Sequence, residues 1–226
     1  MREHKLRCRS LRRFLIWALG LSCLSSTLAL SQSIHQELPR PEWSIGDSWT
    51  YRIVEGPISA NPGVFASTRT FTVLERRSDR YRVSVTTQEE YATRRETSEK
   101  WGISQNLNNY YRENAQLPYT ELEFLRFPLA VGQAWTFEHP TPDGGVFLWS
   151  VRVDGWDEVT VPAGKFATVV IKVEGQKKGG DLYLQRRTIW YAPSAKTKVK
   201  EQWSGQADHG VILRRVSTEL LHYQLR

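Results

Sequence analysis

The stretch 127–175 holds two runs in which apolar side chains fall at every second position, 147–153 and 169–173. An apolar period of two with β-branched and aromatic residues predicts β-strands that have one buried face. Short turn sequences adjoin both runs: Thr-Pro-Asp-Gly-Gly at 141–145 and Val-Pro-Ala-Gly at 161–164. Gaps this short join neighbouring strands in the antiparallel sense, because a parallel connection needs a crossover of about a dozen residues.

The same signals recur after residue 43, with an alternating run at 81–86 and a less regular apolar stretch at 211–225. Further turn sequences separate the runs, at 78–79, 154–155, 179–181 and 208–210. No long helical period occupies this part of the sequence. We therefore expect an all-β domain of about ten to twelve strands, formed as one large antiparallel sheet that is curled into a half-barrel or packed as a β-sandwich.

A short motif occurs twice in the chain. Residues 46–51 are Gly-Asp-Ser-Trp-Thr-Tyr, and residues 132–137 are Gly-Gln-Ala-Trp-Thr-Phe. The two copies predict an internal two-fold repeat with halves at 43–115 and 127–226. We expect the halves to share one sheet and one core, because no linker rich in Pro, Gly or Ser separates them.

The first 31 residues have the plan of a secretory signal peptide, with a basic start, an apolar centre and a small-residue end. Ala29 and Ser31 occupy the −3 and −1 positions of a cleavage site before Gln32. The apolar centre is short for a spanning helix, which needs roughly 20 apolar residues. We expect a signal helix at 1–31 that lies outside the folded domain, and retention of this leader as a membrane anchor is the alternative.

Cys23 gives the leader a second interpretation, as a lipidation signal. It follows Gly20, Leu21 and Ser22, and the small serine is typical of the position before a lipidated cysteine. Gly20 stands where such signals usually have leucine. Cleavage before Gln32, with Ala29 and Ser31 at −3 and −1, is therefore favoured over lipidation. Both cysteines, Cys8 and Cys23, belong to the leader, and we expect no disulfide in the domain.

Beyond the leader we expect an irregular lead-in at 32–42 and a single antiparallel β domain at 43–226. The first 31 residues hold six of the 31 Lys and Arg residues and one of the 24 Asp and Glu residues, so the remainder carries a formal net charge of +2. The high isoelectric point is therefore mostly a property of the leader. It gives little support to nucleic-acid binding, and no nucleic acid is expected as a partner.

No motif in the sequence predicts catalysis. Residues 46–48, Gly-Asp-Ser, resemble the nucleophile block of some lipases and esterases, but the second copy at 132–134 keeps only the glycine. Residues that both copies retain are those that a turn and a strand need. The histidines after the leader lack metal-site spacing. We expect a protein that is not an enzyme and has no metal site and no cofactor.

Eight tryptophans follow the leader, and most are expected in the core. Trp49, Trp135 and Trp149 are predicted core residues because of their places in strand patterns. Aromatic residues near loops or strand ends are the better ligand-binding candidates: Trp101, Tyr110, Tyr111, Trp190 and Tyr191. Basic residues, including the alternating Lys196, Lys198 and Lys200, are expected on the solvated face of the sheet.

Three features of 43–203 resemble bacterial exported proteins of unknown function. They are the Gly-x-x-Trp-Thr strand start, the Val-Pro-Ala-Gly-Lys-Phe turn at 161–166, and Ile-Trp-Tyr-Ala-Pro at 189–193 followed by Val199 and Lys200. This family lies in the broad neighbourhood of envelope lipoproteins and lipoprotein carriers. The resemblance implies an antiparallel sheet curled into a half-barrel or sandwich and an exported location, and it carries no catalytic residues.

Together these features predict a non-catalytic protein of the cell envelope, periplasmic or extracellular, or anchored to a membrane through its N-terminus. Its partner is expected to be a lipid or other apolar ligand, or an envelope protein, bound on the concave face of the sheet. A structural or assembly module that pairs through an exposed strand edge is the alternative. A hydrolase with a dispersed site is less favoured.

Overall fold

The computed structural model describes residues 37–56, 65–90, 96–108, 111–112, 121–141, 144–178, 183–207 and 212–226. The chain divides into two units, Met1–Ile34 and His35–Arg226, and all of these residues belong to the second. The leader lies outside the described residues, with Cys23, Ala29 and Ser31. In the part of the chain that is described, no helix is long and apolar enough to span a membrane.

The described residues form eleven β-strands and one turn of 3-10 helix. The strands are β1 (Ser48–Gly56), β2 (Phe65–Arg76), β3 (Arg80–Glu89), β4 (Glu96–Ser104), β5 (Tyr111–Arg112), β6 (Ala134–Pro140), β7 (Val146–Val161), β8 (Gly164–Lys178), β9 (Tyr183–Ala192), β10 (Thr197–Ala207) and β11 (Ile212–Gln224), and the 3-10 turn η1 is Pro193–Ala195. All the strands belong to one sheet with the order β5-β4-β3-β2-β1-β11-β10-β9-β8-β7-β6. The all-β prediction and the expected number of strands are confirmed.

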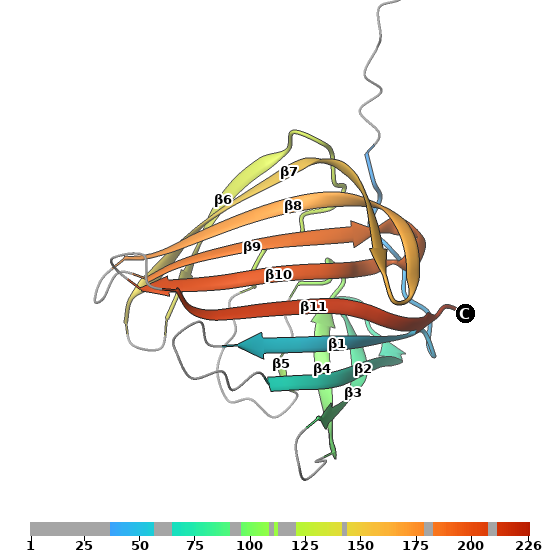
Figure 1. The fold of residues 1–226 in the computed structure, drawn as a ribbon. Helices are drawn as coiled ribbons and strands as arrows, with labels where there is room; N and C mark the ends of the chain where they lie inside the picture. Colours follow the sequence, from blue (N-terminus) through green and yellow to red (C-terminus); the bar gives the residue numbers. More distant parts are fainter. Residues whose placement is uncertain are drawn as a thin grey trace, which may run out of the picture. The chain divides into compact units, whose positions relative to one another are not determined.

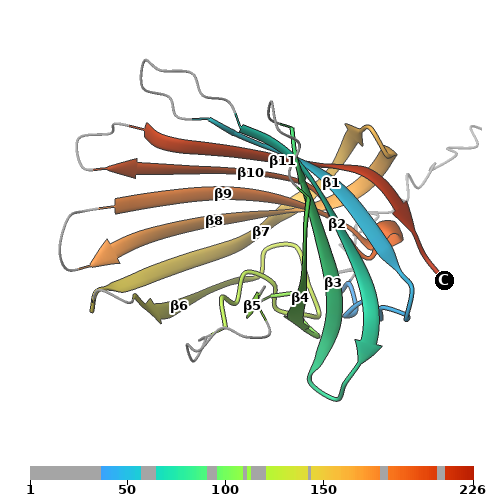
Figure 2. The same cartoon turned by 90° about the horizontal axis from the view of Figure 1, so that it is seen from below.

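The sheet consists of two antiparallel meanders, β1–β5 and β6–β11, which are joined where β1 pairs with β11. The two ends of the strand order, β5 and β6, are not paired with each other among the described residues, so the sheet stays open. Figures 1 and 2 show that it curls strongly. Of the two expected architectures, the sheet adopts the half-barrel.

The turns that precede β1 and β6 have the same backbone arrangement, as the repeated motif predicts. Gly46 and Gly132 have φ values of 90° and 87°, in the left-handed region that favours glycine. The Gly46 N–H donates to the carbonyl of Val73 on β2, and the Gly132 N–H donates to the carbonyl of Val153 on β7, both at 2.9 Å. Each glycine thus connects its turn to the second strand of its own meander.

A side-chain oxygen closes both turns from the position after the glycine. Asp47 Oδ2 accepts from the backbone N–H of Ser44 at 2.8 Å, and Gln133 Oε1 accepts from that of Ala130 at 3.2 Å. Aspartate and glutamine supply the same acceptor, so the change between the two copies preserves the turn. The Gly-Asp-Ser block is therefore explained by folding.

The tryptophans of the two motifs also occupy equivalent places. Trp49 Nε1 donates to the carbonyl of Ala195 at 2.8 Å, and Trp135 Nε1 donates to that of Glu123 at 2.7 Å. Both rings are buried, as is Trp149, which confirms the three predicted core tryptophans. The indole N–H groups of Trp49 and Trp135 each hold a connecting segment to the sheet, whereas the buried Trp149 Nε1 has no hydrogen-bond partner among the described residues.

The concave face of the sheet, called the inner face here, is covered by the segment 121–130, called the strap. Phe124 packs against Trp149 with ring centroids 5.0 Å apart, and Phe127 packs against Tyr191 at 5.4 Å. Figure 2 shows the connection that precedes β6 inside the curl of the sheet. The strap therefore fills part of the space where the sequence analysis places an apolar ligand.

Two sets of polar contacts hold the strap in place. The buried amide of Asn108 donates to the Leu125 carbonyl at 2.6 Å and accepts from the Leu125 N–H at 2.8 Å. Leu129 pairs with Leu38 of the lead-in through two backbone bonds of 2.8 and 2.9 Å. The lead-in and the strap thus form a second layer over the inner face.

Residues 154–155, predicted as a turn, instead lie within β7. A β-bulge between Val153 and Gly155 bends this strand, which continues to Val161 before the predicted Val-Pro-Ala-Gly turn. The N–H of Ala163 in that turn donates to the carbonyl of Leu220 on β11 at 3.0 Å. The bulge lets one long hairpin bend and return to the sheet, which a true turn would prevent.

Candidate functional site

The four described aromatic ligand candidates do not gather at one place. Trp101 is half-buried on β4, where its indole donates to Glu99 at 2.9 Å and its ring meets Phe71 edge-on. Tyr111 begins β5 and pairs with Gly102, and Tyr110 lies outside the described residues.

Trp190 and Tyr191 are neighbours on β9, so their side chains point to opposite faces. Tyr191 is 1% exposed on the inner face, and burial raises the pKa of its phenol. Trp190 lies on the convex face, called the outer face here, and its indole donates to Asp157 at 3.1 Å. Of this pair, Trp190 alone lines a pocket described below.

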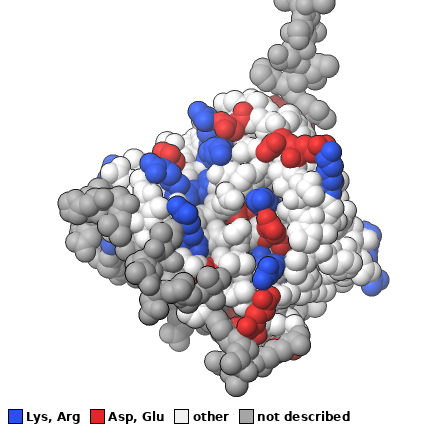
Figure 3. All heavy atoms as spheres, in the orientation of Figure 1, with Lys and Arg blue, Asp and Glu red and all other residues white. Residues whose placement is uncertain are grey.

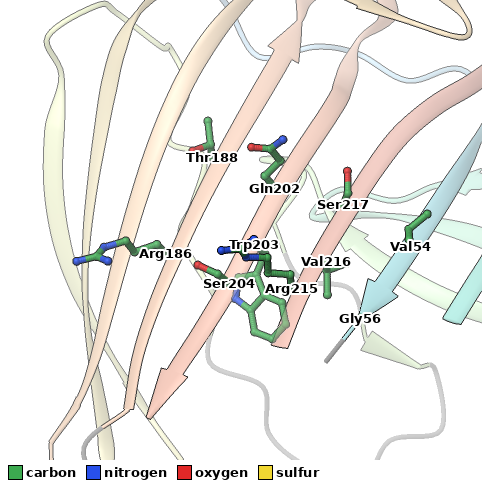
Figure 4. Close-up of a pocket in the computed structure, with 10 residues that line it drawn as sticks. All are labelled: Val54, Gly56, Arg186, Thr188, Gln202, Trp203, Ser204, Arg215, Val216 and Ser217. Carbon is green, nitrogen blue, oxygen red and sulfur yellow. The ribbon is translucent and has the colours of Figure 1, made fainter. Parts of the chain in front are cut away.

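A line of side chains, all polar except that of Val54, crosses the outer face. Pairing in register places it on β8, β9, β10, β11 and β1 in turn: Lys172, Thr188, Gln202, Ser217 and Val54. Figure 4 shows the last four side by side across their strands. Because side chains alternate along a strand, residues two positions away form a parallel line on the same face.

That second line comprises Arg186, Ser204, Arg215 and Gly56. The two lines bound a depression of about 450 Å³, called the outer-face groove here. Trp203 and Val216 complete its lining, although they alternate with the polar residues. The indole of Trp203 donates to Gln185 at 2.9 Å.

The groove is lined by neutral and cationic hydrogen-bonding groups. Thr188, Ser204 and Ser217 supply hydroxyls, and Gln202 supplies an amide. Arg186 and Arg215 supply guanidinium groups, and none of the described residues that line the groove is acidic. This arrangement suits a ligand that presents several hydroxyl or oxyanion groups, because each lining side chain can meet one of them.

Most cations on the outer face are paired with carboxylates, and Figure 3 shows acidic and basic side chains next to one another. The pairs are Arg52–Glu90 at 3.5 Å, Arg152–Asp154 at 2.6 Å, Arg186–Glu174 at 3.5 Å and Lys200–Glu219 at 3.0 Å. Among the described residues, Lys172 and Arg215 have no ion-pair partner. The Lys172 ammonium instead donates to the hydroxyl of Thr188 at 3.3 Å.

A second depression, of about 330 Å³, lies next to the groove where β7 bends. Its lining includes Trp156, Asp157, Lys172 and Trp190. Trp156 is 47% exposed. The ring of Trp190 lies about 6 Å from the ammonium groups of both Lys172 and Lys200, within the range of a cation–π interaction. Lys172 connects the two depressions, since it lines the second and bonds to Thr188 in the first.

The inner face holds a buried ion cluster that serves packing. Glu201 accepts from Arg187 at 2.6 Å and also bonds to Lys198. Burial raises the pKa of Glu201, but the charges of Lys198 and Arg187 outweigh this and hold it at about 2. The Arg187 guanidinium lies 4.7 Å from the ring centroid of Phe124. Through Arg187, the ion cluster on the sheet therefore packs against Phe124 of the strap.

The lysines expected on one solvated face are divided among three environments. Lys196 lies before β10 and is 3.5 Å from buried Asp47. A β-bulge between Lys198 and Lys200 places the former with Glu201 and the latter with Glu219 on the outer face. An inserted residue reverses the alternation, so the prediction of one exposed lysine stripe was wrong.

Metal and catalytic chemistry have little support in the described part of the chain. There, no group of three or more His, Cys, Asp or Glu side chains is arranged to hold a metal ion. Burial lowers the pKa of His139, a residue of edge strand β6. The Asp47 carboxylate is occupied by Ser44, Arg226 and Lys196.

Sequence reasoning missed the residues of the groove. Thr188, Gln202 and Ser217 stand at polar positions of three strands, and such positions are expected on the solvated face with nothing to distinguish one from another. A signal was present, because each lies in an alternating strand. Only the register of β9, β10 and β11 shows that they form one line.

No protein-family model and no curated protein matches this chain. A proposed exported protein with a YmcC-like fold from Bacteroides fragilis is similar in structure, with 13% identity over 83% of this chain and 98% of that chain and a TM-score of 0.39. A proposed lipoprotein from Parabacteroides distasonis has 13% identity over 83% and 97% of the two chains and a TM-score of 0.41. For the hypothetical lipoprotein YmcC from Escherichia coli, the identity is 8% over 76% and 83%, with a TM-score of 0.36. All three are named as exported proteins or lipoproteins, the class that the sequence motifs resemble.

Proposed function

We propose that this chain is a non-catalytic exported protein of the cell envelope that binds a saccharide in the outer-face groove. One observation carries the proposal: six polar side chains, two from each of β9, β10 and β11, converge on the groove. They are Arg186, Thr188, Gln202, Ser204, Arg215 and Ser217. Side chains on paired strands hold their positions well, so such a site is preorganised.

A hydroxyl-rich ligand fits this lining better than an apolar one. Binding sites for apolar molecules are lined mainly by hydrophobic and aromatic side chains, with few polar groups. Here, six of the ten lining residues carry hydroxyl, amide or guanidinium groups, which come from three neighbouring strands. A sugar presents hydroxyls on successive ring carbons and can bond to several of these groups at once.

The contents of the inner face also favour the outer site. The rings of Phe124 and Phe127 occupy the inner face against Trp149 and Tyr191. A lipid bound there would have to displace the strap.

The leader supports export, and a domain without cysteine suits either side of the envelope.

Assembly through a strand edge has less support. Edge strand β6 spans seven residues and ends at Pro140, which cannot donate a ladder hydrogen bond. The strap also contacts it, since Trp135 bonds to Glu123 and its ring lies 5.4 Å from the guanidinium of Arg126. In the described part of the opposite edge, β5 has two residues. Short and covered edges are typical of sheets that avoid pairing with other chains.

Calorimetry of the mature protein with maltohexaose, cellohexaose, chitohexaose and hexagalacturonate tests the proposal. We expect at least one of these to bind, and Ser217→Trp to abolish that binding by filling the groove. Gln202→Ala should weaken it by about fivefold, the usual value of one hydrogen bond. The matched control is Ser150→Ala, an exposed serine of β7 that does not line the groove.

Absence of binding to all four sugars, or equal binding by the Ser217→Trp variant, would refute the proposal. Circular dichroism of each variant separates loss of the site from loss of the fold. Incubation of the same sugars with the protein, followed by mass spectrometry, checks the non-catalytic part. If the wild-type protein cleaves a sugar and a groove variant does not, the protein is an enzyme and the non-catalytic part of the proposal is wrong.

A further inference from the structure

We infer that the saccharide is acidic, and that its negative groups contact Lys172 and Arg215 on either side of a neutral hydroxyl line. The inference rests on the proposed function, because it concerns the ligand of the same groove. Lys172 and Arg215 are the two outer-face cations near the groove that lack an ion-pair partner among the described residues. Neighbouring Lys200 and Arg186 both have one.

The placement of these two cations fixes the dimensions of the ligand. Lys172 lies on β8 and Arg215 on β11, three strand spacings away, and Arg215 stands two residues along β11 from Ser217, the residue in line with Lys172. The separation is therefore about 16 Å. Thr188 and Gln202 lie on the two strands between them, and Ser217 lies on β11 with Arg215. A single phosphate cannot reach both ends, whereas a short oligosaccharide with an acidic group on more than one ring can.

The two ends recognise an oxyanion in different ways. Arg215 presents a planar guanidinium that can hold a carboxylate through two parallel hydrogen bonds. Lys172 presents a compact ammonium that donates one hydrogen bond to the Thr188 hydroxyl. Its other two N–H groups can donate to an oxyanion of the ligand while this bond is kept. We therefore expect a carboxylate at the Arg215 end to contribute more specificity than the group at the Lys172 end.

The second depression borders the groove at Lys172, and its lining includes the carboxylates of Asp154 and Asp157. Because these carboxylates repel an acidic ligand, we expect the saccharide to end at Lys172 and not to continue along β7.

The chemistry required is an oxyanion carried on a hydroxyl-rich ring, which a uronate or a phosphorylated sugar supplies. Calorimetry with hexagalacturonate, phosphorylated maltohexaose and unmodified maltohexaose distinguishes these sources. We expect hexagalacturonate to bind at least about tenfold more tightly than maltohexaose at low salt, with most of the difference lost at high salt. If phosphorylated maltohexaose binds more tightly than hexagalacturonate, the acidic group of the ligand is a phosphate and not a carboxylate.

Charge-neutral variants locate the contacts. Arg215→Gln and Lys172→Gln should each weaken hexagalacturonate binding by about tenfold, and together by about a hundredfold. Maltohexaose binding should fall by less than about fivefold in the double variant, because its contacts are hydrogen bonds to neutral groups. Lys200→Gln is the matched control: this outer-face cation is paired with Glu219 and should leave hexagalacturonate affinity within about twofold.

Two failures are distinguishable. If maltohexaose binds as tightly as hexagalacturonate, or if both lose affinity equally in the double variant, the inference of an acidic ligand is wrong while the saccharide site stands. If no sugar binds the folded wild-type protein, the proposed function fails and this inference fails with it.

Discussion

The carboxylate of Asp47 accepts a hydrogen bond of 2.7 Å from the backbone N–H of Arg226, 179 positions later in the sequence. The same carboxylate accepts the N–H of Ser44 and lies 3.5 Å from the ammonium of Lys196. It is fully buried. One side chain thus connects the turn before β1, the residues after β11 and the start of β10, where the two meanders meet.

Asp47→Ala should lower the free energy of unfolding by about 2–4 kcal/mol, because it leaves buried donors without an acceptor. Urea denaturation followed by tryptophan fluorescence measures this. Gln133→Ala removes the equivalent acceptor of the other turn, which accepts one hydrogen bond from the Ala130 N–H, and should cost about 1 kcal/mol or less. Equal losses in the two variants would show that the contacts with Arg226 and Lys196 add nothing.

Glu201 makes stability depend on pH in the acid range. Its pKa is held at about 2 in the folded protein, below the ordinary 4.5, so the stabilisation is complete above pH 4.5 and is lost as the pH falls toward 2. Glu201→Gln should remove this dependence and cost about 3 kcal/mol at neutral pH, because Arg187 and Lys198 lose their buried partner. Free energies of unfolding from pH 2 to 7 provide the measurement.

The control for that experiment is Ile189→Val, a core change at the position paired with Glu201. It should lower stability by about 1 kcal/mol at every pH and leave the slope unchanged. A Glu201→Gln variant that keeps the wild-type slope would show that another group titrates.

Gly175 gives the Trp149 ring the room it occupies. A Cβ at this position would lie 2.3 Å from the indole, inside any real contact distance. Gly175→Ala should therefore displace Trp149 from its packing with Phe124 and lower the free energy of unfolding by about 1–3 kcal/mol. Denaturant unfolding with the fluorescence spectrum of the native state reports both effects.

A second glycine of the same hairpin provides the comparison. A Cβ on Gly155 would meet nothing within 4 Å, so Gly155→Ala should change stability by no more than about 0.5 kcal/mol. If both substitutions cost the same, backbone freedom rather than space for the indole explains the glycine at 175.

Asn108 keeps the strap on the sheet through its two bonds to Leu125. Asn108→Ala should cost about 2–3 kcal/mol and speed hydrogen exchange of the Leu125 amide by about tenfold or more, because this amide loses its acceptor. Hydrogen exchange with mass spectrometry measures the change. Gln105→Ala removes an exposed side chain that bonds to Arg77 and Ser78, and it should leave exchange in the strap unaltered.

Much of the fold could be predicted because its causes are local. Alternation over 147–153 and the turn at 161–164 mark β7 and β8, and the repeated glycine and tryptophan of the two motifs mark the starts of β1 and β6. The predicted turn at 154–155 was wrong, since a glycine after an aspartate suits a bulge as well as a turn. Local sequence does not distinguish the two.

The candidate site was less predictable. Loop-proximal aromatics were the natural ligand candidates, yet Tyr191 is buried against Phe127 while its neighbour Trp190 lies on the outer face. Which face is covered depends on the strap, whose position is set by contacts such as that of Asn108 with Leu125, 17 residues away. No pattern in either segment alone indicates that contact.

The sequence by itself determined an exported-type leader, an all-β domain and a repeated strand start, because signal segments, period-two patterns and turn residues act over a few neighbouring positions. The tertiary structure alone decided that the inner face is packed and that Thr188, Gln202 and Ser217 form one line. The reason is register: a shift of one residue, as at the bulge between Lys198 and Lys200, moves every later side chain to the opposite face.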